Sequence, residues 1–314
     1  MIGGENMSDF QGPDRDLVGY GRDLPQVRWP GEARVAVSFV MNWEEGSEHS
    51  YWAGDGKNTV GMSETPGHTP PGIRDLGIES VYEYGSRTGI WRLQRLFDSY
   101  DIPLTFFTTA WTIDRYEDVT AWIREKGHEP AGHGLRWERM WEFSRDEEHA
   151  RLKECIEVIE HHVGERPLGW YSRYSPSIHT RELLVAEGFT YDSDSYADDL
   201  PYFASVGQAQ HLVVPYSMTT NDGRFTTAPG YTDPAAFLDH MVRAFDYLWD
   251  EGEQVPKMMS IGLHPRLAGQ PARAHSLKAF IDHAGSKGSV WFAKRLDIAG
   301  WWLDHYREFE TTDS

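Results

Sequence analysis

The stretch Gly127-His128-Glu129-Pro130-Ala131-Gly132-His133-Gly134-Leu135-Arg136-Trp137 decides the fold, because it places a histidine directly after a predicted strand over 128–132. His133 and Trp137 are four residues apart, which is the spacing of many histidine pairs that hold a metal ion. An indole, however, is not among the side chains that bind zinc. The stretch is therefore interpreted as an altered metal-binding motif, and the rest of the chain is predicted to surround it.

Strands and helices alternate on both sides of this stretch. Ala33 to Met41 is almost continuously apolar, as expected for a strand buried in a parallel sheet. Further strands are predicted over 104–110, 168–171, 189–191, 211–215, 258–263 and 290–293, and helices around 91–97 and over 114–126, 144–163, 178–187, 233–250, 271–284 and 298–306. Repeated strand–helix units with right-handed crossovers predict an α/β fold, with the parallel sheet open or wound into a barrel.

The polar residues that could carry chemistry gather in loops that follow the predicted strands. These loops are 42–46, 133–137, 171–176, 192–199, 221–225 and 264–266. In a barrel, the loops after the strands meet at one mouth, so their composition favours an enzyme. A Gly- and Pro-rich loop from Gly46 to Gly72 is long for a compact domain, which is typical of a functional or mobile segment.

The length and composition limit the number of domains and the classes of binding partner that we expect. The 314 residues contain no Ser/Gly-rich linker, so we expect an irregular arm over 1–30 and a single barrel domain over 31–314. A formal net charge of −19 argues against nucleic acid as a partner. A single cysteine, Cys155, and the lack of a signal peptide or long apolar run predict a cytoplasmic protein that does not bind membranes.

Three motifs resemble the polysaccharide deacetylase (NodB-homology) superfamily, in which two histidines and an aspartate hold a divalent metal. They are the stretch 127–137, the run 260–265 that ends in Leu-His-Pro, and the run 166–171 that begins with Arg-Pro. Six more segments resemble its metal-independent allantoinases and related cyclic-amide hydrolases: 42–46, 83–87, 91–93, 191–194, 199–202 and 221–225. The resemblance covers Val35 to about Ala293. It implies a distorted (β/α) barrel of about seven strands that opens a small cyclic amide.

The chain departs from the deacetylase pattern at its metal ligands. Trp137 stands where the second metal-binding histidine is expected, and the two aspartates of the first motif are replaced either by Asn42 and Glu44 or by Glu44 and Glu45. A metal would find at most Glu44 and His133, fewer than the three protein ligands usual for catalytic zinc. We therefore expect no cofactor and no tightly bound metal, with zinc on Glu44 and His133 as the alternative.

The candidate catalytic residues are Glu44, Glu45, His133 and His264. Glu44 or Glu45, with a pKa raised by burial and by its like-charged neighbour, would deprotonate water. His133 would orient that water, and His264 would protonate the departing ring nitrogen. The candidate substrate-binding residues are Asn42 and Arg87 as polarisers of the carbonyl, Trp137 as a pocket wall, Tyr171, and the pair Asp222 and Arg224, which could also bind only each other.

Two other functions stay open at this stage. A metal-dependent polysaccharide or peptidoglycan N-deacetylase is the first alternative, and a non-catalytic ligand-binding barrel is the second. Allantoin, a hydantoin, a cyclic imide or another lactam would each suit a polar pocket with aromatic walls. We expect a small-molecule substrate, and the resemblance implies a homo-oligomer.

Among the tryptophans, Trp141 is predicted to belong to the hydrophobic core.

Overall fold

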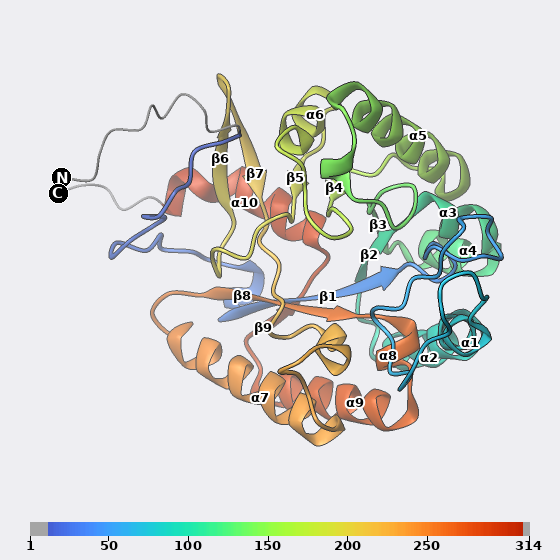
Figure 1. Ribbon diagram of the computed structural model, residues 1–314. Helices are drawn as coiled ribbons and strands as arrows, with labels where there is room; N and C mark the ends of the chain where they lie inside the picture. Colours follow the sequence, from blue (N-terminus) through green and yellow to red (C-terminus); the bar gives the residue numbers. More distant parts are fainter. Residues whose placement is uncertain (1–11, 310–314) are drawn as a thin grey trace, which may run out of the picture.

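A computed structural model of the chain describes residues 12–309 as an α/β barrel whose wall is one nine-stranded sheet (Figure 1). The strands are β1 (Val35–Trp43), β2 (Leu104–Thr108), β3 (Glu129–Gly132), β4 (Gly169–Trp170), β5 (Tyr191–Asp192), β6 (Tyr202–Val206), β7 (Ala209–Val213), β8 (Lys257–Leu263) and β9 (Val290–Phe292). Their order is β6-β7-β5-β4-β3-β2-β1-β8, and β9 also pairs with β1. Neighbouring strands run parallel, except that β6 is antiparallel to β7.

The first strand, β1, lies inside the sheet because its apolar sequence can be buried on both faces. All of its residues are buried, and it pairs with β8 along residues 35–41 on one edge. The other edge of β1 is shared by two strands. Strand β9 pairs with residues 35–37 there, and β2 pairs with residues 39–43. The carboxyl end of β1 therefore enters the barrel mouth between β2 and β8.

The barrel closes between β7 and β8 by a single bridge, between Asn221 and Gly262. A Cβ atom on Gly262 would lie 2.0 Å from the hydroxyl of Tyr216 and 2.5 Å from the amide of Asn221, so only glycine permits this approach. A cavity of about 700 Å³ lies in the gap, lined by residues 196–199, residues 215–220 and the helix α7 (Pro234–Glu251). The barrel is therefore incompletely closed on this side.

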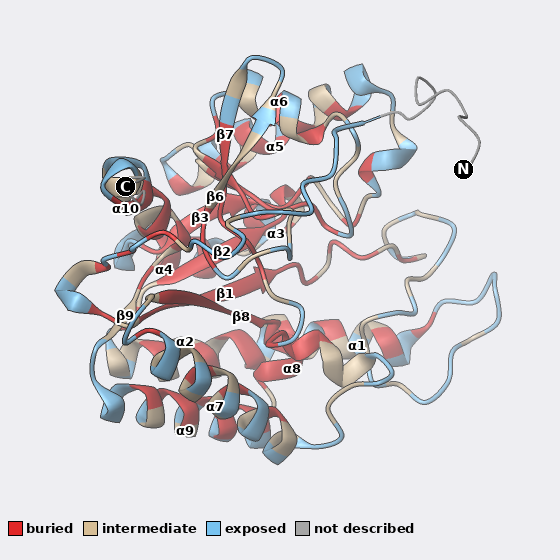
Figure 2. Ribbon diagram, turned by 90° about the vertical axis from the view of Figure 1, so that its left-hand side faces the viewer, coloured by how far each residue is buried: buried red, intermediate tan, exposed pale blue. Residues whose placement is uncertain are grey.

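Helices cover the outside of the sheet and turn their buried faces toward the strands (Figure 2). Besides α7 they are α1 (Leu76–Tyr84), α2 (Ile90–Tyr100), α3 (Ala110–Arg115), α4 (Glu117–Lys126), α5 (Arg145–Val163), α6 (Thr180–Ala186), α8 (Pro265–Ala268), α9 (Pro271–Lys287) and α10 (Arg295–Phe309), with shorter turns η2 (Pro30–Glu32), η3 (Gly85–Gly89), η4 (Met140–Glu142) and η5 (Asp222–Thr226). The predicted helix starts at Ser144 and Asp233 are confirmed: Ser144 and Glu147 form a capping box, and Asp233 accepts two backbone N–H groups.

The predicted α/β barrel is confirmed, with three corrections. The sheet has nine strands instead of about seven. Strand β6 was not predicted because none of its residues is fully buried, so it lacks the apolar signal of an inner strand. Residues 76–100 are helical throughout, where a helix was predicted only around 91–97. Trp141, predicted as core, is half exposed.

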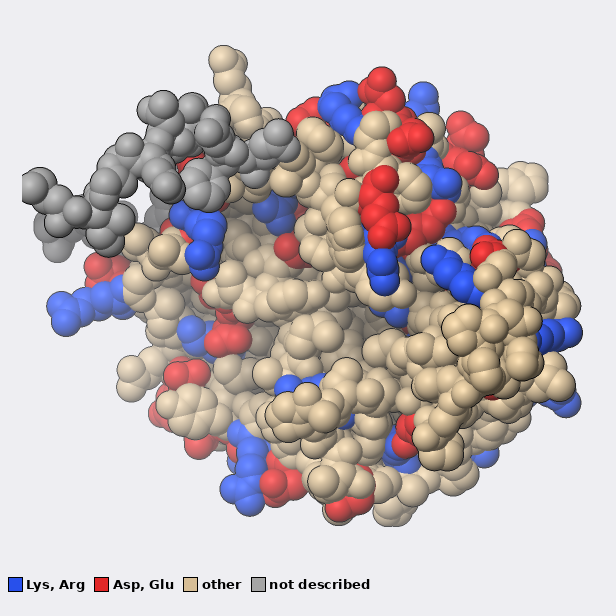
Figure 3. All heavy atoms as spheres, in the orientation of Figure 1, with Lys and Arg blue, Asp and Glu red and all other residues tan. Residues whose placement is uncertain are grey.

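The described part of the predicted arm, residues 12–29, is irregular, but its end belongs to the core. Val27 and Trp29 are buried, and the ring of Trp29 lies 6.0 Å from that of Trp302 in α10. Within residues 12–309, no helix combines the length and apolar character needed to cross a membrane. On the face drawn in Figure 3, acidic and basic side chains are interspersed around the edge and form no continuous basic surface.

Candidate active site

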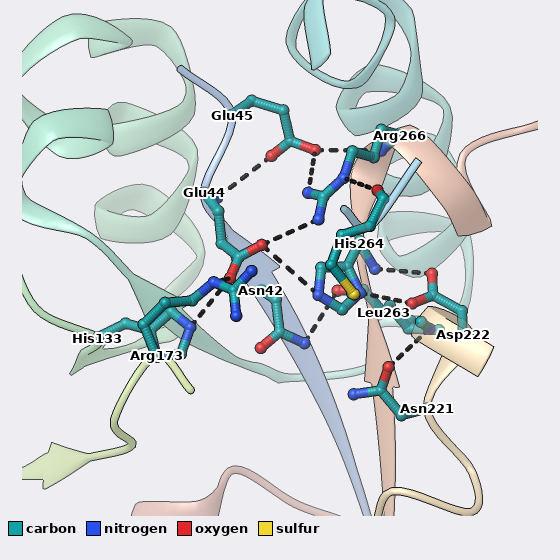
Figure 4. Close-up of polar contacts among 12 residues, drawn as sticks. Asn42, Glu44, Glu45, His133, Arg173, Asn221, Asp222, Leu263, His264 and Arg266 are labelled. Carbon is teal, nitrogen blue, oxygen red and sulfur yellow. Dashed lines mark hydrogen bonds and ion pairs between the residues drawn. The ribbon is translucent and has the colours of Figure 1, made fainter. Parts of the chain in front are cut away.

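Seven ionisable side chains from five strand ends form one buried cluster at the mouth of the barrel (Figure 4). They are Glu44 and Glu45 after β1, His133 after β3, Arg173 after β4, Asp222 in η5 after β7, and His264 and Arg266 after β8. None is more than 9% exposed. The convergence predicted for the loops after the strands is therefore observed, and it concentrates charge in a buried site.

Glu44 is the centre of the cluster. Its Oε1 lies 3.1 Å from Nε2 of His133 and 2.8 Å from Nε of Arg173. Its Oε2 lies 3.2 Å from Nη2 of Arg266 and 3.6 Å from Nε2 of His264. Burial alone would raise the pKa of Glu44, but Arg173, His133, His264 and Arg266 together hold it well below its usual value. Glu44 is therefore an ionised carboxylate at neutral pH, which corrects the raised pKa expected for it.

Glu45 points away from the two histidines and toward the helical segment behind the site. Its Oε1 accepts the backbone N–H and Nη1 of Arg266, and its Oε2 accepts the backbone N–H of Glu44. A Cβ atom on Gly85 would lie 2.4 Å from this carboxylate, so glycine is required there. Burial raises the pKa of Glu45, and Arg266 offsets only part of that effect. The raised pKa that the sequence predicts for Glu44 or Glu45 is therefore found on Glu45, which does not face the histidines.

His133 is held on both ring nitrogens. Its Nδ1 lies against the carbonyl oxygen of Tyr171, and its Nε2 faces Glu44. A carbonyl oxygen can only accept, so Nδ1 carries a proton. The ring also stacks on that of Tyr171, with centroids 5.3 Å apart and planes 8° apart. Tyr171, predicted to bind substrate, therefore supports His133 through both its carbonyl group and its ring.

His264 is oriented by Asp222. The Asp222 carboxylate lies 2.6 Å from Nδ1 of His264 and accepts the backbone N–H groups of His264 at 2.8 Å and Ala268 at 2.9 Å. Nδ1 therefore carries a proton, and Nε2 is the nitrogen that faces Glu44. Asp222 was predicted to bind substrate, but its contacts make it the residue that fixes the ring and tautomer of His264.

Arg266 occupies the space between the two glutamates. Besides its bonds to both carboxylates, its Nε donates to the carbonyl oxygen of Met62 at 3.2 Å. Its guanidinium carbon lies 4.8 Å from the ring of Tyr82 and 5.4 Å from that of Trp137. A fixed positive charge is therefore built in beside the two carboxylates, enclosed by aromatic rings in place of water.

The Trp137 side chain is buried, with 1% of its surface exposed, so neither face of its ring is open to the barrel mouth. The guanidinium of Arg173 lies 3.8 Å from its ring, and Tyr82 packs on it edge-on at 5.4 Å. The sequence predicts that this indole forms a wall of the pocket, where a substrate would lie against its ring. The neighbouring guanidinium occupies that position, so Trp137 holds an arginine in place and does not form the pocket wall.

The structure does not bring Arg87 and Arg224 into the cluster. The Arg87 side chain is 76% exposed and lies 3.7 Å from Glu83, one turn away on the same helical segment. Arg224 donates to the carbonyl oxygen of Pro229 and contacts neither Asp222 nor the histidines. Both are therefore withdrawn as candidate substrate-binding residues. Sequence position alone could not show that they face outward.

Asn42 lies in the cluster but has no free amide hydrogen. Its Nδ2 donates to the Tyr216 hydroxyl at 3.1 Å and to the Leu263 carbonyl oxygen at 3.3 Å. An amide nitrogen has two hydrogens, and these contacts use both. Asn42 therefore orders the floor of the site and cannot polarise a substrate carbonyl as we had expected.

The long loop after β1 covers the cluster and is anchored by arginines. Arg136 makes a two-pronged pair with Asp55 at 2.9 Å, and Arg273 pairs with Glu64. Met62 packs against Tyr82 and Trp137 above Arg266. The segment predicted to be functional or mobile thus closes one side of the site.

The residues of the cluster do not fit a tightly held zinc ion. Glu44 and His133 are the two candidate ligands, but both oxygens of Glu44 already face guanidinium groups. Trp137 supplies no ligand, and no group of three or more His, Cys, Asp or Glu side chains within residues 12–309 is arranged to hold a metal. Two neighbouring guanidiniums would also repel a divalent cation.

Sequence reasoning missed two members of the cluster, Arg173 and Arg266. Both lie in loops that had been marked as part of the mouth, 171–176 and 264–266. An arginine in a loop is most often exposed, so its residue type alone gives no signal of burial. The available signal was position: each arginine closely follows a predicted strand, as Glu44 and His133 do.

A protein-family model described as polysaccharide deacetylase matches residues 77–189. A Schizosaccharomyces pombe protein named "Putative polysaccharide deacetylase" is 34% identical over 312 residues, which cover 92% of this chain and 96% of that protein. The similarity to this yeast protein therefore extends over nearly the whole chain.

Two solved structures are similar in both sequence and fold. The crystal structure of the Puue allantoinase is 44% identical, with a TM-score of 0.88, and the match covers 95% of this chain and 99% of that one. A probable polysaccharide deacetylase from Pseudomonas aeruginosa is 43% identical, with the same TM-score and the same coverage. These two proteins are named for different activities, although this chain is almost equally similar to both. The chemistry of the cluster therefore has to distinguish between the two activities.

Proposed function

The chain belongs to the polysaccharide deacetylase superfamily of hydrolases, and we propose that it opens a small cyclic amide, a ureide or imide ring, at Glu44. One observation carries the proposal: the buried Glu44 carboxyl group lies between two guanidiniums and two imidazoles. The likeness to the Puue allantoinase over almost the whole chain supports it.

In the first step, water attacks the ring carbonyl. Glu44 accepts a proton from the water as the new C–O bond forms, and His133 fixes the orientation of the carboxylate through Nε2. The π electrons of the carbonyl move onto its oxygen. The buried surroundings of Glu44 strengthen each of these electrostatic contacts relative to water.

In the second step, the ring C–N bond breaks. The electron pair on oxygen reforms the carbonyl, and the leaving nitrogen takes a proton from Nε2 of His264. Asp222 keeps that nitrogen directed toward Glu44 by holding Nδ1. The proton held by Glu44 can then return to His264 across the 3.6 Å gap. The product is a carboxylate whose amide or urea nitrogen stays neutral, so each turnover releases one proton.

The electrostatics of Glu44 favour an activated carbonyl as substrate. A carboxylate with a lowered pKa is a weak base, so it removes a proton from water efficiently only when the attacked carbon is strongly electrophilic. In a ureide or imide, a second carbonyl withdraws electrons from the ring nitrogen and makes it a better leaving group. The ring also fixes the geometry of attack. An N-acetyl group on a sugar offers neither advantage.

A metal-dependent N-deacetylase is the second candidate, and the names of several relatives favour it. Such an enzyme gains carbonyl activation from a metal acting as a Lewis acid. The cluster argues against it, because guanidiniums surround Glu44 where a cation would bind. A non-catalytic barrel is the third candidate, and the oriented pair of Asp222 and His264 argues against it.

The proposal is tested with purified protein in a pH-stat. Allantoin, hydantoin, dihydrouracil and succinimide are supplied in turn, and base uptake is compared with loss of the ring by chromatography. We expect one proton released per ring opened for at least one of these compounds. N-acetylated chitooligosaccharides and peptidoglycan fragments should release no acetate. Acetate release without any ring opening would replace the proposal by the deacetylase alternative.

A further inference from the structure

The proposed reaction needs a donor for the oxygen that gains negative charge, and most candidates in the cluster are already used. Both amide hydrogens of Asn42 are bonded within the protein. Both ring nitrogens of His133 are engaged, and each guanidinium nitrogen of Arg266 bonds to a glutamate or to Met62. These bonds hold the two glutamates in place, so a guanidinium with nitrogens that have no partner is the better candidate for the donor.

Arg173 is the cluster residue with free donors. It is 9% exposed, yet neither its Nε nor its Nη2 has a hydrogen-bond partner among residues 12–309. Its Nε lies 2.8 Å from Oε1 of Glu44, but the N–H group is not directed at that oxygen. The pair is therefore a close charge contact that leaves N–H groups available. A buried guanidinium with unused donors is costly unless a ligand completes it.

The faces of the Arg173 guanidinium are covered by aromatic rings, and its Nε and Nη2 atoms are themselves buried without a hydrogen-bond partner among residues 12–309. Its central carbon lies 3.8 Å from the ring of Trp137 and 4.2 Å from that of Tyr174. Figure 4 shows this guanidinium beside the Glu44 carboxylate. An acceptor can reach the N–H groups only in the guanidinium plane. A carbonyl oxygen suits such an approach.

The backbone next to Arg173 is held in an unfavourable conformation. Tyr174 has a φ of 142°, in a region that is essentially reserved for glycine. The preceding Ser172 is fixed by two hydrogen bonds to Asp194, both of 2.8 Å. Strain of this kind persists where surrounding contacts impose it, and it concentrates at functional sites. Here it accompanies the placement of Arg173 beside Glu44.

We propose that Arg173 is a catalytic residue whose Nε–H and Nη2–H groups bind the oxygen of the attacked ring carbonyl and stabilise the negative charge that forms there. This inference rests on the proposed hydrolysis at Glu44. As water attacks, its proton goes to Glu44 and the carbonyl electron pair goes to the oxygen held by Arg173. When the C–N bond breaks, that pair returns to the carbonyl and the nitrogen takes the proton of His264. Arg173 sits on the Oε1 side of Glu44 and His264 on the Oε2 side, so oxygen and leaving nitrogen face different residues.

The first test is Arg173→Lys, which keeps a positive charge near Glu44 but loses the planar pair of donors. We expect kcat for ring opening to fall by about 10²- to 10³-fold, as for loss of an oxyanion donor, while KM changes little. Arg139→Lys is the matched control, because Arg139 lies exposed above Tyr174 and pairs with Glu142. It should leave both constants unchanged. A higher KM at unchanged kcat would overturn the assignment.

A pH profile separates this role from simple support of Glu44. If Arg173 only kept Glu44 ionised, its loss would raise the pKa of Glu44, and activity would recover fully at higher pH. The proposal predicts the same fold-loss in kcat across the alkaline plateau. Arg173→Gln has a planar but neutral side chain and should also lower kcat on the alkaline plateau. It replaces Arg173→Lys as the test if the lysine variant does not unfold cooperatively on heating.

Failure of the proposed function would look different. If wild-type protein opens no ring but releases acetate from N-acetylated sugars, the ring-opening proposal is lost. The same variants are then measured on acetate release. A fall in plateau kcat there would retain Arg173 as the donor for the carbonyl oxygen, and unchanged kcat would exclude it.

Discussion

Two buried arginines, one inside the barrel and one at its mouth, show what distinguishes a structural charge from a reactive site. Arg295 begins α10, and its guanidinium enters the barrel beneath the rings of Phe107 and Tyr216. Arg173 lies at the mouth beside Glu44. Both are at least nine-tenths buried. Burial of a charge alone therefore does not identify a site.

The difference lies in their hydrogen bonds. Arg295 donates to the hydroxyls of Ser193 and Ser260 and to the carbonyl oxygens of Val214 and Pro215. Every nitrogen of its guanidinium has a partner, so it links several strands and needs no ligand. Within residues 12–309, Arg173 keeps two nitrogens without hydrogen-bond partners. Unsatisfied donors, in addition to burial, therefore distinguish the arginine at the mouth from the one inside the barrel.

The largest effect is expected at the mouth, for Glu44→Gln. The amide cannot accept the proton of the attacking water, so kcat should fall by about 10⁴-fold, the upper end of the range for general-base catalysis. Steady-state kinetics on the best ring substrate measure this. Glu83→Gln is the control, since Glu83 is exposed and its carboxylate pairs with Arg87 outside the cluster. More than a tenth of wild-type kcat in the glutamine variant would remove Glu44 from the chemistry.

A smaller loss is expected for His264→Asn, because an electrophilic ring needs less help from the acid. We predict a fall in kcat of about 10²- to 10³-fold with unchanged circular dichroism. Asp222→Asn should lower kcat by a lesser factor, since it disturbs only the orientation of His264. Wild-type turnover in His264→Asn would reduce this histidine to a structural role.

Inside the barrel, Arg295→Met should affect stability and spare the chemistry. Two hydroxyls and two carbonyl groups lose their donor, so the free energy of unfolding should fall by about 3 to 5 kcal/mol. Urea unfolding measures this loss. Below the melting range, kcat per folded molecule should stay within a few-fold of wild type. A large drop in kcat with little change in stability would reverse the contrast between the two arginines.

The smallest effect concerns Glu48, whose carboxylate accepts the backbone N–H of Gly46 in the covering loop. Burial raises the pKa of Glu48 from 4.5 to about 7. Its protonated form therefore favours the folded state, and this stability is present below pH 4.5 and lost as the pH rises through 7. Between pH 5 and pH 8, wild type should lose up to about 3 kcal/mol more stability than Glu48→Gln. Equal losses in the two proteins would contradict this.

The sequence allowed most of the barrel to be predicted, because inner strands such as β1 are apolar on both faces and loops after parallel strands must converge. It did not allow β6 to be predicted, since an edge hairpin with half-buried residues lacks that pattern. Among the site residues, Glu44, His133 and His264 were predictable because each closely follows a predicted strand.

The arginines of the site were not predictable from residue type. Arg87 lies in the segment 83–87, whose resemblance to the allantoinases predicts a polariser, yet its helical position turns it outward. Arg173 and Arg266 became recognisable only once packing showed them buried against Glu44. Which face of a helix or loop points inward depends on tertiary contacts between distant segments, and no local pattern records those contacts.

The central claim is that guanidinium groups around Glu44 serve a reaction that needs no metal, and one measurement tests it most directly. Ring opening is followed on one preparation before and after exhaustive chelation, with the metal content determined in each sample. We predict well below one metal ion per chain and an unchanged rate after chelation. Loss of activity on chelation, restored by one equivalent of zinc per chain, would contradict the account.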